Sequence, residues 1–262
     1  MRYAILILSS LLLMLASCEK VINVDLKNSD KRVVIQGFIT DESGTVNHTI
    51  MISRSVAFSA SNEPDFVQGA FVVVTDLTEG KSDTTLEVSP GNYQTQRTPG
   101  VPGHTYQLVA KVGDETFTST STMPDPVPFD SLYVDSFSAF GGVLHQFTPV
   151  FQDPAGQPNY YAFQLQINDT LLNTIDAWDD QYSDGKINSR PLNVNDEDLF
   201  SGKDTVTVTM YCTEKAIYNF FYTLVNATGN GQTPANPLST ISGNALGYFG
   251  AVTMRRRVLI MP

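Results

Sequence analysis

The sequence predicts a mainly β protein made of two immunoglobulin-like β-sandwich domains, the second with one helix and a long acidic insertion. Three observations lead to this prediction. Short runs of alternating or β-branched residues, separated by turn residues, recur through residues 33–122. Three prolines within residues 123–129 then interrupt the pattern, since proline cannot sit inside a sheet or a helix. Strand-like runs resume at residue 130 and continue to the end of the chain.

The first seventeen residues predict a signal peptide. Arg2 supplies a positive charge, and the stretch that follows is apolar apart from two serines and shorter than the ~20 residues that span a bilayer. The four residues ending at Cys18 read Leu-Ala-Ser-Cys and resemble a bacterial lipobox. We therefore expect cleavage before Cys18 and lipidation of its thiol. The alternative is an ordinary signal peptide followed by an incidental cysteine.

A lipidated Cys18 predicts attachment to a membrane, because two or more acyl chains hold a protein firmly. Glu19 follows the cysteine instead of an aspartate, which favours the bacterial outer membrane. The prediction does not specify the periplasmic or the surface face. Residues 18–32 are polar and of mixed charge, which is typical of a tether.

Composition excludes several classes of protein. The 262 residues include 27 acidic and 16 basic side chains, a formal charge of -11, so nucleic acid is a poor partner. The only other cysteine is Cys212, so a disulfide framework and a multi-cysteine zinc site are excluded. Cys212 lies in a strand-like run and is expected to be buried and inert.

The expected elements follow from apolar spacing. In the N-terminal sandwich, residues 33–122, alternation predicts strands at 33–40, 45–53, 70–76, 84–88, 105–112 and 115–121. Residues 123–129 are the expected proline-rich linker. In the C-terminal domain, residues 130–262, strands are expected at 130–137, 143–151, 159–167, 205–212, 247–253 and 257–260. Helical spacing predicts one helix at about 213–227, with Thr213 as its N-cap. Residues 173–204 are weakly patterned and acidic, and are interpreted as an insertion.

This insertion holds the candidate ligand-binding residues. Loops that combine aromatic and acidic side chains often bind ligands, and Trp and Tyr are favoured anchors. Sugar and peptide ligands are both compatible with this composition. The alternative is that the aromatic residues fix the insertion onto its own domain. The candidates are Trp178, Asp179, Asp180, Tyr182 and Asp184.

No metal site and no cofactor are predicted, and Ca²⁺ is the alternative. Residues 180–185 resemble the first half of a calcium loop. Tyr182 stands where a ligand oxygen is needed, and Pro191 replaces the bidentate glutamate at the twelfth position. A solvated acidic loop is therefore preferred.

The histidines and the carboxylates do not form a recognised catalytic motif in the sequence. His48, His104 and His145 lack the spacing of a metal site, and phosphate-binding and nucleophile motifs are absent from the sequence. Carboxylates within residues 176–204 could serve a surface hydrolase as acid and base, but nothing fixes two of them at a defined separation. Arg255, Arg256 and Arg257 are interpreted as a charged edge strand that blocks edge-to-edge association.

The order of several segments resembles the domain-of-unknown-function 4249 family of Bacteroidota outer-membrane lipoproteins. The most specific segment is residues 243–250, Gly-Asn-Ala-Leu-Gly-Tyr-Phe-Gly. The resemblance implies a lipoprotein often encoded beside a TonB-dependent transporter, and it transfers no catalytic residue. The other segments are 18–22, 33–41, 89–93, 103–108, 123–124 with 130–133, 151–154 with 159–161, and 184–186.

Together these features predict a non-enzymatic outer-membrane lipoprotein that serves a TonB-dependent transporter as an accessory or ligand-binding subunit. Two alternatives stay open: a surface hydrolase that uses the carboxylates of residues 176–204, and an adhesin or structural module.

Overall fold

A computed structural model describes residues 31–56, 63–139, 142–192, 202–228 and 236–261. The predicted signal peptide, Cys18 and the tether up to residue 30 lie outside the described residues. The described chain is mainly β, as predicted, and its one helix is α2 (Lys215–Thr228). Within this part of the chain, no helix combines the length and the hydropathy needed to cross a membrane.

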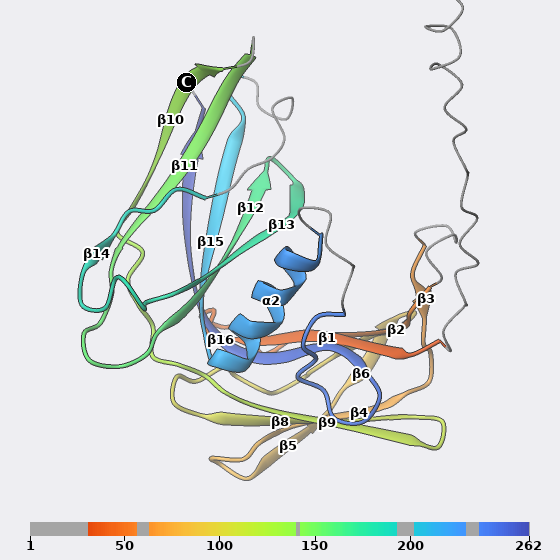
Figure 1. Cartoon of the computed structure of the whole chain (residues 1–262). Helices are drawn as coiled ribbons and strands as arrows, with labels where there is room; N and C mark the ends of the chain where they lie inside the picture. The colour runs from red at the N-terminus through yellow and green to blue at the C-terminus, as the bar shows by residue number, and fades with distance from the viewer. Residues whose placement is uncertain (1–30, 57–62, 140–141, 193–201, 229–235, 262) are drawn as a thin grey trace, which may run out of the picture. The chain divides into compact units, whose positions relative to one another are not determined.

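Two sheets pack face to face in the first sandwich (Figure 1). The strands are β1 (Val33–Thr40), β2 (Thr49–Arg54), β3 (Asp65–Phe66), β4 (Phe71–Asp76), β5 (Lys81–Thr84), β6 (Leu86–Ser89), β7 (Asn92–Gln94), β8 (Thr105–Val112), β9 (Glu115–Thr122) and β16 (Leu246–Ile260). One layer is the part β16-β1-β2-β7-β6 of a nine-stranded sheet, with β3 beside β2. The other has the order β5-β4-β8-β9.

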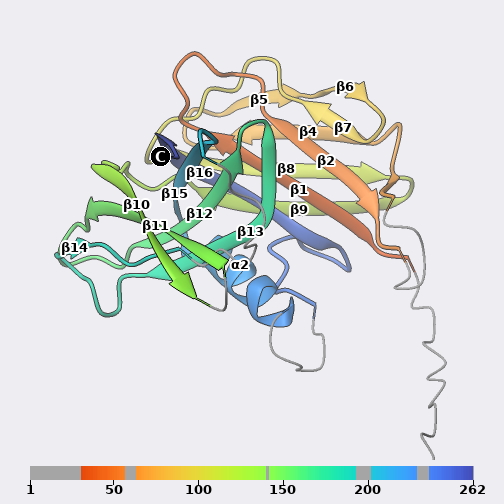
Figure 2. The ribbon, with the colours of Figure 1, turned by 90° about the horizontal axis from the view of Figure 1, so that it is seen from above.

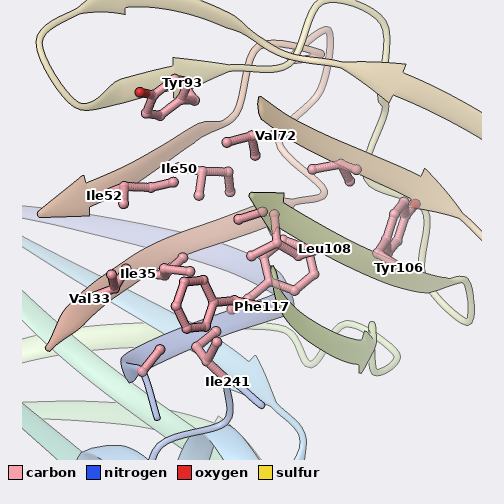
Figure 3. Packing of buried hydrophobic residues seen from close by; sticks show 14 of the residues in the cluster. Val33, Ile35, Ile50, Ile52, Val72, Tyr93, Tyr106, Leu108, Phe117 and Ile241 are labelled. Atoms are coloured by element: carbon pink, nitrogen blue, oxygen red, sulfur yellow. The ribbon is translucent and has the colours of Figure 1, made fainter. Parts of the chain in front are cut away.

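The core of the first sandwich follows from strict alternation along its strands. In β1 every second residue is buried and those between are half-buried, so one face meets the other sheet. Figure 3 shows Ile35 and Ile50 from one sheet facing Leu108 and Phe117 from the other. Burying side chains of this size contributes about 1.5–3 kcal/mol each, which makes this interface a main source of stability.

The second sandwich packs the other part of the nine-stranded sheet, β13-β12-β15-β16, against the sheet β10-β11-β14. Phe147 and Phe151 from one sheet meet Tyr161 and Phe163 from the other. Its own strands are β10 (Ser131–Ala139), β11 (Gly142–Gln152), β12 (Tyr160–Ile167), β13 (Thr170–Asp179), β14 (Ile187–Asn188) and β15 (Thr205–Thr213).

Strand β16 belongs to both sandwiches. Its first half, from Leu246 to Val252, runs parallel to β1, and from Thr253 it pairs antiparallel with β15. Residues 246–252, which the sequence places in the second of the expected domains (33–122 and 130–262), therefore complete the first sandwich. The arginine run that separated two expected strands lies within this one continuous strand.

The expected linker, residues 123–129, has no regular secondary structure. It is nevertheless part of both cores. Met123 is buried in the first sandwich, while Val127 and Phe129 are buried in the second. The segment therefore fixes the two sandwiches to each other through packing.

Helix α2 lies in the angle between the two parts of the nine-stranded sheet that meet at β16 (Figures 1 and 2). Ile217, Phe220 and Phe221 are buried there, as helical spacing predicted. The predicted N-cap is wrong by one residue. Thr213 ends β15 and donates its hydroxyl proton to the Tyr160 carbonyl, whereas Glu214 precedes the helix and its carbonyl accepts the first helical hydrogen bond.

Candidate functional site

A cleft of about 410 Å³ lies beside α2, on the face of β1 that is turned away from the first core. Gln36 of β1 stands between Met51 of β2 and Tyr248 of β16, so three neighbouring strands form the floor. The lining residues are Gln36, Gly37, Phe38, Thr40, Glu42, Thr45, Asn47, His48, Thr49, Met51, Tyr211, Tyr248, Met254 and Arg256. They come from both sandwiches, and no local motif of the sequence indicated them.

Three aromatic rings form one wall of the cleft. The Phe38 ring centroid lies 5.5 Å from that of Tyr211 and 4.9 Å from that of Tyr248. Phe221 of α2 supports them from behind, with its ring 6.0 Å from that of Phe38. Burial raises the pKa of Tyr211, and raises that of Tyr248 to about 12, so both phenols are neutral at pH 7.

Polar side chains line the rest of the cleft and have few partners. Within the described chain, the side chains of Gln36, Asn47 and Thr49 make no hydrogen bond, so their donors and acceptors are free for a ligand. His48 is buried, and this burial lowers the pKa of its imidazole, which is therefore neutral at pH 7.

The charges of the cleft cancel. Arg256 and Glu42 are its only permanently charged lining residues, and Arg256 Nη1 lies 2.6 Å from Glu42 Oε1. The cleft is therefore neutral in a chain whose net charge is -11. A ligand can enter it without desolvating an unpaired charge, which would be costly.

Trp178, the predicted aromatic anchor, is buried in the second core instead. Residues 170–179 form strand β13, so the expected insertion begins later than residue 173, and its stretch from 193 to 201 lies outside the described residues. The Trp178 ring packs 4.3 Å from that of Phe163, and the Arg190 guanidinium lies 4.7 Å from its centroid. The indole is 1% exposed, so Trp178 fixes this segment to its own domain. This is the alternative to ligand binding that the sequence left open.

The other predicted residues do not form one site. Tyr182 is 84% exposed at the surface. Asp179 accepts a hydrogen bond of 3.2 Å from the Tyr218 hydroxyl of α2, so it supports the helix. Only Asp180 and Asp184 are brought together, and a third carboxylate, Asp153, joins them with ligand-type oxygens within 4.8 Å. Sequence reasoning missed Asp153, which read only as part of a turn.

This acidic cluster connects two turns. The Asp153 carboxylate accepts hydrogen bonds from the Tyr161 hydroxyl and the Gly185 N–H. Asp180 accepts one from the Asn159 N–H, at 2.7 Å. Asp184 accepts one from the Gly156 N–H, also at 2.7 Å. Burial, with the nearby charges of Asp180 and Asp184, raises the pKa of Asp153. These three residues are the described side chains that could hold a divalent cation, although most of their oxygens already have partners.

The family model described as Domain of unknown function (DUF4249) matches residues 19–257. The chain belongs to this family. A search of curated proteins found no match. Two segments that carry the DUF4249 resemblance, 33–41 and 243–250, pair along β1 and β16 and form the floor of the cleft.

Proposed function

We propose that this DUF4249 protein is a lipid-anchored, non-enzymatic subunit that binds a ligand at the bacterial outer membrane and serves a TonB-dependent transporter. The observation that carries the proposal is the neutral cleft beside α2. Its volume of about 410 Å³ lies within the usual range of small-molecule sites, and it combines apolar walls with a few free polar groups.

The sequence supports the membrane part of the proposal. The lipobox-like residues before Cys18 favour acylation of its thiol, and the family resemblance favours a transporter as partner. An acyl anchor would leave the sandwiches free to present the cleft to a ligand.

Two measurements test the proposal. Mass spectrometry of the native protein is expected to find an acylated Cys18 as its first residue, and Cys18→Ser is expected to release the protein from membranes. Cys212→Ser is the matched control and should stay membrane-bound, because Cys212 is buried in the second core. An unlipidated chain that keeps its first seventeen residues would overturn the anchor.

The partner is tested by purifying the lipid-anchored protein in mild detergent. We expect a TonB-dependent transporter to co-purify in a fixed ratio. Recovery of the protein alone would count against this part of the proposal. Turnover of a glycan or a peptide by the mature protein, lost in Asp180→Asn, would identify the hydrolase alternative instead.

A further inference from the structure

We infer that the cleft beside α2 binds a neutral oligosaccharide. This inference rests on the proposed ligand-binding function and names the chemical class of the ligand. The first step is electrostatic. Arg256 Nη1 and Glu42 Oε1 form an ion pair at 2.6 Å, so neither charge of the cleft is free to pair with a charged ligand. An anionic ligand would also approach a chain of net charge -11, which disfavours its binding.

The second step concerns surface chemistry. Sugar rings present C–H groups on their faces and hydroxyl groups around their edges. Phe38, Tyr211 and Tyr248 provide aromatic surface, whose negative π-face attracts C–H groups. The side-chain amides of Gln36 and Asn47 each combine a donor and an acceptor, and can therefore bond neighbouring hydroxyls of one sugar.

The third step separates a sugar from a peptide. An extended peptide binds a sheet most effectively at a free edge, through its main-chain hydrogen bonds. Over Val34–Gly37 the floor has no such edge, because β1 is paired with β16 on one side and with β2 on the other. Along this stretch the main-chain groups are used, and the Gln36 side chain is free to bind. This arrangement suits a ligand recognised through hydroxyl groups.

The experiment is isothermal titration of the mature protein with four neutral hexasaccharides: maltohexaose, cellohexaose, mannohexaose and xylohexaose. We expect at least one to bind, and Gln36→Ala and Asn47→Ala each to raise its Kd about tenfold, since each removes hydrogen bonds made only to the ligand. Gln107→Ala is the matched control, because Gln107 is a half-buried residue of β8 on the other sheet. It should leave Kd unchanged.

Two results would overturn the inference. One is failure of all four sugars to bind at millimolar concentration. The other is binding that Gln36→Ala and Asn47→Ala leave unaffected. Hexagalacturonate and an uncharged hexapeptide are titrated in parallel. If either binds in place of the neutral sugars and is weakened by Gln36→Ala, the ligand class is wrong while the proposed ligand-binding function stands. If neutral sugars bind but no transporter co-purifies, the inference stands and the proposed partner fails.

Discussion

Arg255 Nη1 donates a hydrogen bond of 2.8 Å to Asp41 Oδ2 at the point where β16 leaves β1. The other oxygen of the same carboxylate accepts the Met254 N–H at 2.7 Å. Asp41 follows the last residue of β1, so its side chain replaces the strand partner that β16 loses there. The arginine run is thus tied to the junction of the two sandwiches.

Replacement of Asp41 is expected to destabilise this junction. Asp41→Ala removes the acceptor of the Met254 N–H and the carboxylate partner of Arg255, whose guanidinium keeps its bond to the Met254 carbonyl. We expect a loss of about 1–3 kcal/mol in the free energy of unfolding. Urea denaturation measures it. Glu42→Ala is the control, because the Glu42–Arg256 pair is half-exposed and should contribute at most about 1 kcal/mol. Equal losses in the two variants would contradict the capping role of Asp41.

Gly247 is expected to tolerate no side chain. Its φ is +101°, and an added Cβ would lie 2.0 Å from the Ile35 carbonyl oxygen of β1. Gly247→Ala must therefore separate β16 from β1, and we expect a sharply reduced soluble yield. The comparison is Gly103→Ala, where φ is +82° but no atom lies within 4 Å, so only about 1–2 kcal/mol of backbone strain applies. Similar yields and urea midpoints for both variants would show that the close approach is unimportant.

The pH dependence of stability should report on Asp153. Its pKa is raised above the ordinary value of 3.8, chiefly by burial. A carboxyl group of this kind stabilises the fold fully below its unfolded-state pKa, and this contribution is lost as pH rises through the folded-state pKa. Asp153→Asn replaces the carboxyl group with an amide that does not ionise, so the variant does not lose stability in this way. As pH rises above the ordinary carboxyl pKa of 3.8, the free energy of unfolding of the variant should therefore increase relative to that of the native chain.

Asp76 provides a control of opposite sign. Burial alone would raise its pKa, but hydrogen bonds from His104 and from the N–H groups of Glu79 and Thr78 outweigh burial and lower it. Its contribution is present above the unfolded-state pKa and lost as pH falls through the folded-state pKa. Asp76→Asn should thus be less stable than the native chain at pH 7, with the difference shrinking in acid. Parallel pH profiles for the two variants would contradict at least one of the two assignments.

Calcium at about 1 mM is expected to leave the Tm unchanged. Ca²⁺ needs six to eight oxygen ligands. Both Asp153 oxygens already accept hydrogen bonds, and Asp180 and Asp184 each use one oxygen in the same way. Differential scanning fluorimetry with calcium or EDTA checks this. A calcium-dependent rise in Tm that Asp184→Asn abolishes would show that the cluster is a metal site.

Local patterns predicted most of the fold. The alternation of Val33–Thr40 and the helical spacing after residue 213 are direct results of which face each element buries. Strand β13 was missed because Asp176 and Asp179 dilute its apolar pattern, although Asp176 is buried and Asp179 bonds the helix. The sequence predicted two strands in place of β16 because the three arginines interrupt its apolar run. Two of these arginines form ion pairs with residues about 200 positions earlier in the chain, and a local pattern does not show such partners.

The candidate site could not be predicted in the same way. The cleft exists because Gln36 and Tyr248 lie side by side, and this neighbourhood depends on pairing between distant strands. Trp178 was predicted to bind a ligand because of its acidic neighbours in sequence. A side chain as large as an indole buries more apolar surface in a core, and there it packs on Phe163. Residue type alone did not distinguish the two roles.

The shared strand β16 sets the order in which the protein can be completed. Strand β1 is made early, yet one of its two neighbours, residues 246–252, is made about 200 residues later, so closing that edge requires a long loop. A nascent polypeptide that lacks residues 246–260 has an open edge in the first sheet and an unpaired side on β15. Residues 246–260 must therefore be made before either sandwich is closed, and a chain cut short before residue 246 loses both at once.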